Sequence, residues 1–565
     1  MESGSKTATR CFIDGRNASF NQIGQNQYNI TYTTQTSEIQ EVLSSLKPVD
    51  RVGYYVAPCM EGTRERTLKE IYDWLDDDNA PNVLWISGNP GSGKSTLASS
   101  LVSRLIELRR LGSSFFFKRG DINLSDPAVV WRTIAYDLGQ HNSTFADSLM
   151  EAMKGRLILH EMPDIAMHFR ILIEEPLMQS YHDCPSPVIL IDALDECDPR
   201  TVRRQQLVDT LAKWSHLPKR FKIIITSRNE RFISDNFRAI CKQMVLPTGD
   251  SVNDEANGDI YRFFQERLAS SGSLSPEWPW KRVLSVLTSR AAGLFIWADT
   301  VVKFVEQGLP GMRLALVLKG DLGSGDGTTN LYQQVLYLSF PQPDVSTLQV
   351  VRKVVAAIIF AKGPIFYEDL SELVSEPHSS VMYILDKLSS VVTVGKQDRY
   401  IHIGHLSFTE FMCDPQRCPE EFFIDRCGES QKLAMACFRL MKNGLRFNIC
   451  DLQSSHLWNH EVKDLSQKIE KGISAALWYS CRFWVAHLRD TMIRSVCESG
   501  LIKEVEEFLY FRILYWLEVL SLKQEVAVAS RALLTLASWI QVGISILFSM
   551  FHSRSVAIGI ESRIG

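Results

Sequence analysis

The stretch "LWISGNPGSGKSTLASSLVSRL", residues 84–105, decides the fold of this 565-residue chain. Its apolar beginning predicts a strand, and the leucines that recur after the glycine-rich loop predict an amphipathic helix. The loop between them matches G-x-x-x-x-G-K-[ST], the pattern of a phosphate-binding loop. Because strand, loop and helix follow one another in the order that the motif requires, a chance glycine turn is a poor explanation.

The residue types of this loop suit phosphate binding. Glycines allow several backbone N–H groups to point at one phosphate chain, and the helix N-terminus adds partial positive charge. Lys94 is expected to meet the β- and γ-phosphates, while the Ser95 hydroxyl is expected to bind Mg²⁺. The predicted nucleotide contacts of the loop are Gly88, Asn89, Pro90, Gly91, Ser92, Gly93, Lys94, Ser95 and Thr96.

A second stretch, "VILIDALDECD" (188–198), ends an apolar run with four carboxylates. A P-loop protein needs an acid at the carboxyl end of another strand to hold Mg²⁺ through water, and Asp192 is predicted to be that acid. Asp195 or Glu196, one short turn further on, is the predicted catalytic carboxylate that orients or deprotonates the attacking water. Asp198 is expected to cap the following helix or to face solvent.

A third stretch, "KIIITSRNE" (222–230), places Arg228 just past a strand end. Strand ends on this edge of a parallel sheet line the ligand crevice, so Arg228 is predicted to contact the γ-phosphate. The alternative is a surface arginine that pairs with Glu230. The guanine-reading pattern N-K-x-D does not occur in the sequence, so the predicted cofactors are ATP or ADP with Mg²⁺.

Short apolar runs alternate with helical segments over residues 51–250, which predicts a P-loop NTPase domain with a doubly wound parallel α/β sheet. Helices dominate beyond this point. They predict a helical domain (251–330), a winged helix with a hairpin at 391–394 and 400–403 (331–415), and an all-helical C-terminal region (416–565). The five predicted strands are residues 83–86, 114–117, 188–191, 222–226 and 243–246.

Residues 1–50 lack a helical period, and their composition predicts a disordered leader. Within it, residues 19–37 are rich in Asn, Gln and Thr, which also suits an amyloid-type polar β motif. No apolar signal segment begins the sequence, and its 12 cysteines form no C-x-x-C pair, so a cytoplasmic location is predicted. The net charge of −4 argues against general attraction to nucleic acid or acidic membranes. Residues 533–551 carry no charge, but their polar side chains favour a buried helix over a membrane span.

Six segments together resemble the NACHT class of signal-transducing P-loop ATPases, and most closely the fungal NACHT proteins linked to vegetative incompatibility, with their nephrocystin-like N-terminal NACHT domain. The resemblance spans roughly residues 50–415. The segments that carry it are "EGTRERTLKEIYDWL" (61–75), "WISGNPGSGKST" (85–96), "ILIDALDECD" (189–198), "IIITSR" (223–228), "AAGLFIWADTVVKFV" (291–305) and "IGHLSFTEFM" (403–412).

The resemblance implies a switch that is closed with ADP, opens by exchange to ATP, and then forms homo-oligomers. It also implies that His405 contacts the bound diphosphate, where the alternative is a packed core histidine, and that Thr63 and Arg64 lie near the base. The N-terminal "FNQIGQNQYNI" resembles short amyloid-signalling motifs, which implies a signalling partner. Family members usually add repeats as a sensor, and none is visible in this sequence.

The main hypothesis is therefore a nucleotide-dependent signalling switch with slow ATP hydrolysis. One alternative is a nucleotide-binding scaffold without hydrolysis. Another is a winged-helix DNA-binding regulator, but the expected reading helix, "SSVMYILDKLSS" (379–390), carries a single lysine. A groove-reading helix normally brings more basic residues, so no nucleic-acid partner is predicted.

Overall fold

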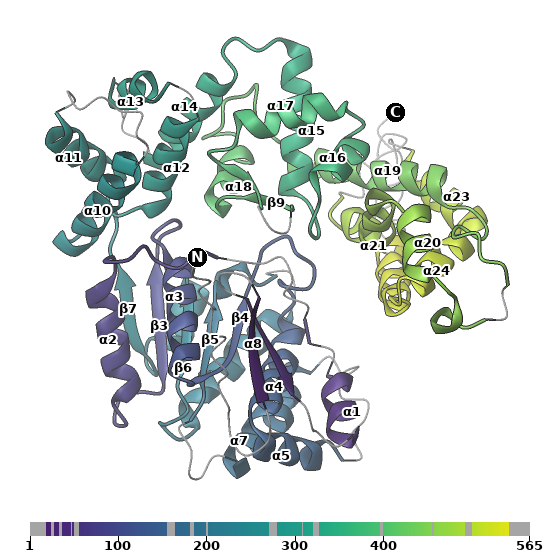
Figure 1. Cartoon of the computed structure of the whole chain (residues 1–565), viewed down its shortest axis with the longest axis horizontal. Helices are drawn as coiled ribbons and strands as arrows, with labels where there is room; N and C mark the ends of the chain where they lie inside the picture. Colours follow the sequence, from purple (N-terminus) through teal and green to yellow (C-terminus); the bar gives the residue numbers. More distant parts are fainter. Residues whose placement is uncertain are drawn as a thin grey trace, which may run out of the picture. The chain divides into compact units, whose positions relative to one another are not determined.

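The chain divides into two compact units (Figure 1). The first comprises residues 1–119 and 123–248, and the second comprises residues 120–122 and 249–565. The computed structural model describes residues 18–23, 27–32, 37–46, 48–49, 56–154, 164–180, 186–198, 202–270, 279–307, 309–319, 327–395, 399–454, 457–491 and 500–541.

The first unit is built on a five-stranded sheet whose neighbouring strands are all parallel. All five strands predicted from the sequence are present, and strand β6 lies between the P-loop strand β3 and the acid-bearing strand β5. The phosphate loop and the acids therefore lie at the same, carboxyl edge of the sheet, one strand apart. In spatial order the strands are β4 (Leu111–Phe116), β5 (Val188–Asp192), β6 (Ile223–Ser227), β3 (Val83–Gly88) and β7 (Lys242–Leu246).

Helices cover both faces of this sheet, as a doubly wound fold requires. On one face, α2 (Glu65–Asp76) and α3 (Lys94–Glu107) pack on Leu84 and Ile86. Val83 and Trp85 point to the other face, because side chains alternate along a strand. The helices with buried residues in that second core are α1 (Ser37–Ser45), α4 (Val130–His141), α5 (Ser143–Met153), α6 (Ile165–Phe169), α7 (Glu175–Ser180), α8 (Val202–Lys213) and α9 (Arg231–Phe237).

The structure differs from the sequence prediction before residue 50. An antiparallel hairpin pairs β1 (Ala18–Ile23) with β2 (Gln27–Tyr32), and helix α1 follows where no helix was predicted. Leu43 of α1 is 1% exposed, and a Cβ atom at Gly139 of α4 would lie 2.7 Å from its Cδ2 atom. Helix α1 is thus part of the core. The amyloid-type motif within residues 19–37 stays a prediction.

In its described residues, the second unit consists of helices and one short hairpin around an apolar core. The hairpin predicted near residues 391–403 is present as the antiparallel strands β8 (Val392–Val394) and β9 (Ile401–Ile403). The helices up to α18 are α10 (Asp254–Ser270), α11 (Trp280–Ala291), α12 (Phe295–Glu306), α13 (Pro310–Lys319), α14 (Gly327–Ser339), α15 (Val345–Ile359), α16 (Tyr367–Val374), α17 (His378–Lys387) and α18 (Leu406–Met412). The winged-helix assignment and the boundaries between the predicted domains stay predictions.

The C-terminal helices of this unit pack through aromatic rings. Trp484 lies in the middle of the group, with its ring 5.3 Å from that of Phe438, 4.9 Å from that of Phe508 and 6.0 Å from that of Trp516. Within the described residues, no helix is long and apolar enough to cross a membrane, and residues 542–551 of the charge-free stretch lie outside them. The helices are α19 (Arg426–Gly444), α20 (Leu465–Gly472), α21 (Ala475–Arg489), α23 (Leu501–Phe511), α24 (Ile513–Leu522) and residues 527–541.

Replacing Leu43 with Ala tests whether α1 belongs to the core. The change removes buried methyl groups, so we expect the free energy of unfolding to fall by about 2–5 kcal/mol. Glu41→Ala, on the exposed side of the same helix, is the matched control and should change it by less than about 0.5 kcal/mol. Urea unfolding followed by tryptophan fluorescence measures both. Equal stabilities of the two variants would show that α1 does not contribute to the fold.

Candidate nucleotide-binding site

The phosphate loop joins β3 to α3 and depends on its glycines. Gly91 and Gly93 have φ angles of 81° and 90°, in the left-handed region that glycine adopts without steric cost. A Cβ atom at Gly88 would lie 2.7 Å from the Ser92 Oγ atom, so this position also requires glycine. Asn89 and Pro90 complete the turn, and the Asn89 side chain donates a hydrogen bond to Thr248 Oγ1 at 2.7 Å.

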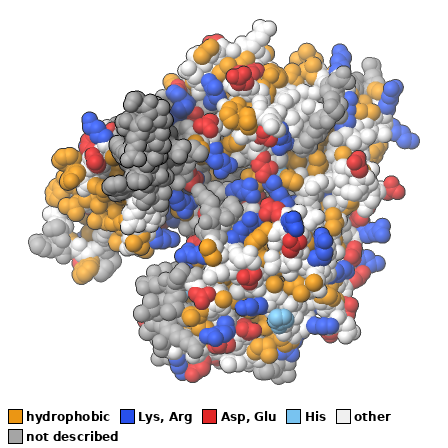
Figure 2. Space-filling view, turned by 180° about the vertical axis from the view of Figure 1, so that it is seen from behind, with side chains coloured by type: hydrophobic (Ala, Val, Ile, Leu, Met, Phe, Trp, Pro, Cys, Tyr) orange, Lys and Arg blue, Asp and Glu red, His pale blue; other side chains and the backbone are white. Residues whose placement is uncertain are grey.

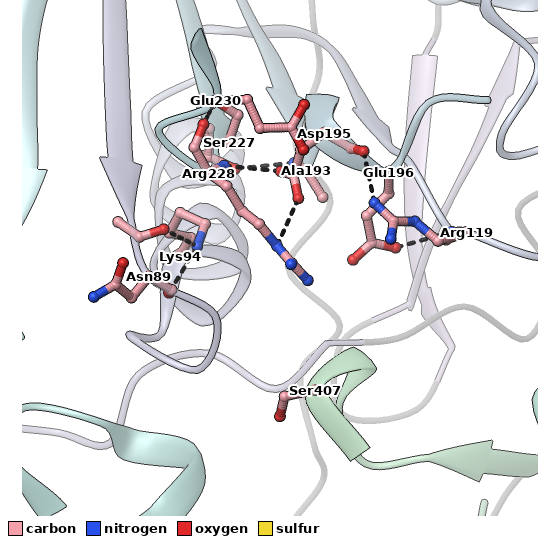
Figure 3. Close-up of polar contacts among 12 residues, drawn as sticks. Asn89, Lys94, Arg119, Ala193, Asp195, Glu196, Ser227, Arg228, Glu230 and Ser407 are labelled. Atoms are coloured by element: carbon pink, nitrogen blue, oxygen red, sulfur yellow. Dashed lines mark hydrogen bonds and ion pairs between the residues drawn. The ribbon is translucent and has the colours of Figure 1, made fainter. Parts of the chain in front are cut away.

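Lys94 begins helix α3 and folds back over the loop (Figure 3). Its Nζ atom donates to the carbonyl oxygens of Gly88 at 2.8 Å and Asn89 at 3.0 Å. Burial lowers the pKa of Lys94, and the carboxylates of Asp195 and Asp192 oppose this effect. A lysine held at the loop in this way can meet a phosphate as a positive charge. Ser95 and Thr96 follow in the first turn of α3, and both are partly buried.

Arg64 binds the backbone of the phosphate loop. It is 2% exposed, and its Nη2 atom donates to the Ser92 carbonyl oxygen at 2.7 Å. Thr63, beside it, is 4% exposed and donates through Oγ1 to the Met60 carbonyl oxygen at 2.6 Å. The structure thus brings Arg64 to the loop, where it holds the backbone, while the contact of Thr63 is to Met60. Their predicted position near the base stays a prediction.

Asp192 is the last residue of β5 and is fully buried. The hydroxyl of Thr226, on the neighbouring strand β6, donates to its Oδ1 atom at 2.5 Å. The same hydroxyl accepts the N–H of Ala193 at 3.0 Å, and Ala193 has a φ angle of 55° that turns the chain at the strand end. Burial raises the pKa of Asp192, while the hydroxyls of Ser95 and Thr226 lower it. Thr226 thus fixes both the carboxylate and the turn after it.

The residues around Asp192 fit Mg²⁺. Its second oxygen, Oδ2, is buried and has no hydrogen-bond partner, which is unusual for a carboxylate oxygen without a cation or water. The described residues hold no cluster of three or more His, Cys, Asp or Glu that could bind a metal ion by itself. Mg²⁺ in nucleotide sites typically takes one or two protein oxygens and completes its shell with phosphate and water. The Ser95 hydroxyl and Asp192 would supply those protein oxygens.

Asp195 and Arg228 bind each other twice. Arg228 donates its main-chain N–H to Asp195 Oδ1 at 2.9 Å, and its Nε atom lies 3.0 Å from Asp195 Oδ2 (Figure 3). The alternative partner, Glu230, instead pairs with Arg204 at 2.7 Å. Both oxygens of Asp195 are therefore engaged, and this carboxylate holds Arg228 at the strand end. It is less suited than Glu196 to take a proton from water.

Glu196 occupies a different environment in the same turn, the 3-10 helix Leu194–Glu196. Its Oε2 atom accepts the main-chain N–H of Arg119 at 2.9 Å, and the Arg119 Nη2 atom donates to the Asp195 carbonyl oxygen at 3.0 Å. Burial raises the pKa of Glu196 to about 7, against the hydrogen bond and charge of Arg119 that lower it. A carboxyl group that titrates near neutral pH is suited to general base catalysis.

His405 lies in the second unit and has a structural role there. It is the N-cap residue of α18, and its Nδ1 atom accepts the main-chain N–H of Ser407 at 3.1 Å. An accepting Nδ1 atom places the proton of a neutral imidazole on Nε2. The packed core position that was the alternative is not what the structure shows, because His405 is only partly buried. Its predicted contact with the diphosphate stays a prediction.

Sequence reasoning missed two residues of this site, Thr226 and Arg119. The sequence around Thr226 indicated only an apolar strand. The one available signal was that Thr226 is a polar residue near the end of that strand. Arg119 lies 77 residues before Glu196 and reaches it only because β4 and β5 are neighbours in the sheet. Neither contact follows from a spacing in the sequence.

Comparison with known proteins identifies relatives of this arrangement. Residues 62–228 match the family described as nephrocystin 3, N-terminal. The chain is 22% identical over 526 residues to vegetative incompatibility protein HET-E-1 of Podospora anserina, which covers 82% of this chain and 36% of that protein. It is 25% identical over 161 residues to cell division control protein 18 of Schizosaccharomyces pombe, covering 28% and 24% of the two chains. The chain thus spans 36% or less of the length of these two curated relatives.

Among solved structures, the chain aligns with a signal transduction ATPase with numerous domains from Pyrococcus horikoshii that has a tetratricopeptide repeat sensor. The alignment has 15% identity and a TM-score of 0.40, and it covers 89% of this chain and 67% of that chain.

Thr226→Val tests the hydroxyl that holds Asp192. The substitution keeps the side-chain shape but leaves Asp192 Oδ1 without its donor, which costs about 1–3 kcal/mol. We expect the variant to bind ATP more weakly than the wild type when Mg²⁺ is present. When a chelator removes Mg²⁺, the two proteins should bind ATP about equally. Titration calorimetry measures both affinities. Thr226→Ser retains the hydroxyl and should behave like the wild type. Equal Mg²⁺ dependence in the Val and Ser variants would contradict the role of this hydroxyl.

Proposed function

We propose that this chain, whose residues 62–228 match the nephrocystin 3 N-terminal family, is a nucleotide-dependent signalling switch of the NACHT type. The observation that carries the proposal is the pairing of a glycine-dependent phosphate loop with a buried acid one strand away. The Lys94 amine is held at the loop, and the unpartnered Oδ2 atom of Asp192 is left for a hydrated cation. The proposed setting of this switch is fungal self/non-self recognition or programmed cell death, and the similarity to a vegetative incompatibility protein, HET-E-1, supports the first of these.

Each residue of the site would have its own role in binding or hydrolysing the nucleotide. Lys94 would bind the β- and γ-phosphates, while Arg64 keeps the loop in shape through the Ser92 carbonyl group. Bound Mg²⁺, held by Ser95 and Asp192, would neutralise charge that develops on the phosphate oxygens. Arg228, oriented by Asp195, would contact the γ-phosphate. Glu196 would accept a proton from the attacking water.

Slow hydrolysis is part of this proposal. Asp195 is bound through both oxygens to Arg228, so Glu196, whose pKa burial raises to about 7, is the carboxylate of the pair that remains as the base. A switch requires a long-lived nucleotide state rather than rapid turnover.

Further parts of the proposal concern the rest of the chain. We place His405 at the diphosphate of the ADP state, where an Nε2–H group would donate a hydrogen bond. Exchange to ATP would release this contact and expose surfaces for homo-oligomerisation, and the N-terminal motif would recruit a signalling partner. Figure 2 shows Lys and Arg side chains interspersed with Asp and Glu on the face that it displays, which favours a partner other than nucleic acid.

Lys94→Ala should remove nucleotide retention. Loss of the charged contact to the phosphates is expected to weaken ATP and ADP binding about tenfold or more. Lys69→Ala changes an exposed lysine on α2 and is the matched control. Chromatography of the nucleotide released from purified protein, with calorimetric titration, measures both variants. If Lys94→Ala retains ATP as the control does, the proposed switch is wrong.

The pH dependence of ATP hydrolysis should report Glu196. The carboxylate form is the active base, so the rate should rise with pH up to about 7 and level off above it. Single-turnover hydrolysis between pH 5.5 and 8.5, a range set around that pKa, measures the profile. Glu196→Gln should lower the plateau by about a hundredfold and abolish this titration while leaving ATP affinity intact.

Stability provides an independent check on the same group. The folded pKa of about 7 lies above the ordinary value of 4.5, so the folded protein binds more protons than the unfolded chain between these values. The free energy of unfolding should therefore fall as pH rises through this window, and Glu196→Gln should remove that decline. Equal rates of ATP hydrolysis in wild type and Glu196→Gln would remove Glu196 from the mechanism, and nucleotide binding without phosphate release in the wild type would favour a nucleotide-binding scaffold.

A further inference from the structure

Six large apolar side chains of the second unit are exposed beside its C-terminal helix α24. Their exposed fractions are 51–82%, although side chains of these types are usually buried. Figure 2 shows hydrophobic side chains gathered over the C-terminal helices, at the left of that view. We call the six residues the α24 face. They are Phe447, Leu457, Trp458, Tyr510, Phe511 and Leu514.

Helix α24 provides the axis of this surface. Leu514, Glu518 and Ser521 lie on one side of the helix, because residues three and four apart are neighbours on a helix surface. Tyr510 and Phe511 end α23, about one turn before Leu514. The two helices thus contribute three of the six exposed side chains.

The loop after α19 holds Phe447 beside α24. The Glu518 carboxylate accepts the N–H groups of Asn448 and Ile449, each at 3.2 Å. The Asn448 side chain closes the loop through hydrogen bonds to the main chain of Leu452 at 2.8 and 2.9 Å. Phe447 is nevertheless 77% exposed. An apolar side chain on a loop that is already ordered is a preorganised anchor, because binding a partner costs it little conformational entropy.

A second loop brings Trp458 to the same side of the helix. The Asn459 Nδ2 atom donates to the Ser521 carbonyl oxygen at 2.9 Å, and the Trp458 N–H donates to Glu461 Oε2 at 2.8 Å. Ser521 follows Leu514 by seven residues, so the two lie about 10 Å apart along the helix. The α24 face is therefore one continuous surface.

The size of the α24 face suits a protein interface. An aromatic side chain can bury about 150–250 Å², so the four exposed rings offer about 600 Å², and the two leucines bring the total to roughly 700–800 Å². The largest apolar patch on a typical monomer is only about 300–600 Å². A stable interface buries about 800 Å² on each partner. The face is thus large enough to support a dimer by itself.

Charges of both signs surround the α24 face. Lys442 pairs with Glu507 at 2.7 Å, and Arg512 lies 3.4 Å from the same carboxylate. Arg446 pairs with Asp451 at 3.1 Å. An acidic membrane or a nucleic acid would meet acidic groups here as well as basic ones. A second copy turned about a two-fold axis can instead place its basic groups opposite acidic groups of the first.

We propose that the α24 face is the contact surface of a symmetric dimer, in which the partner is a second copy of this chain. Each copy contributes the same six side chains, which pack against one another across a two-fold axis. Aromatic residues at the centre and ion pairs at the rim are the usual composition of such an interface. The dimer requires no nucleotide, so the inference goes beyond the proposed switch and does not depend on it.

Three variants of the full chain test the α24 face. Phe447→Asp and Phe511→Asp each place a charge in the interface, and neither change empties the core, because both side chains are exposed. Val345→Asp is the matched control, since Val345 is 70% exposed at the start of α15. Circular dichroism during heating should show the same unfolding midpoint for each variant as for the wild type.

Sedimentation equilibrium without nucleotide is the first measurement. We expect the wild type to dimerise with a Kd of about 1 µM or below, as interfaces of this size do. Each phenylalanine variant should raise this Kd about a hundredfold or more, because the substitution occurs twice in a symmetric dimer. Val345→Asp should match the wild type. A wild-type monomer at concentrations about a hundredfold above this Kd would overturn the inference, and so would a dimer that the phenylalanine variants do not weaken.

Hydrogen exchange of the wild type is the second measurement and needs no variant. On dilution through the dimer Kd, exchange should become faster in residues 445–452 and 509–518 and stay unchanged in the phosphate loop. Equal exchange at every concentration would refute the dimer, including the case in which another part of the same chain covers the face. Association that appears only with a non-hydrolysable ATP analogue would belong to the proposed switch and would also refute it. A nucleotide-free dimer that the variants weaken would support the inference even if the chain bound no ATP.

Discussion

The burial of the Asp192 carboxylate at the end of β5 is the constraint on which the site depends. A fully buried carboxylate is costly unless hydrogen bonds or a cation compensate for lost hydration. Thr226 compensates one oxygen, and the Oδ2 atom remains without a partner. The fold can hold this arrangement because β6 lies beside β5 and brings Thr226 to the same level. A nucleotide-bound cation would complete the compensation, which couples the stability of this edge to the bound ligand.

Charge balance extends from this carboxylate across the turn. The three acids lie close together at the end of β5 and in the turn after it, while the three basic groups come from three other segments and offset the repulsion among the acids. Asp195 is matched by Arg228 in a doubly hydrogen-bonded pair, and Glu196 by Arg119. The left-handed conformation of Ala193 starts the turn that directs these two carboxylates to different partners. The six charged groups are Asp192, Asp195, Glu196, Lys94, Arg119 and Arg228.

The sequence predicted the elements whose signal is local. The phosphate loop, the five strands and the identity of Asp192 as a strand-end acid all follow from residue order within one segment. Contacts set by sheet order could not be predicted, because the position of β6 between β3 and β5 is a property of the whole sheet. Thr226 and Arg119 belong to this second class. Helix α1 was not predicted because the apolar residues in and next to it, Ile39, Leu43 and Leu46, are few and follow a polar tract. The same limit applied to Arg228, whose partner is 33 residues away rather than two.

Asp195 and Glu196 stood as equal candidates in the sequence, and their surroundings separate them. Asp195 receives the main-chain N–H and the Nε–H of Arg228, so both of its oxygens are bound to that arginine. Glu196 has one oxygen bound by a main-chain N–H, and burial brings its pKa to about 7. A carboxylate with both oxygens bound suits positioning, and one that titrates near neutrality suits proton transfer. Two adjacent carboxylates can therefore take different roles, because they face different arginines.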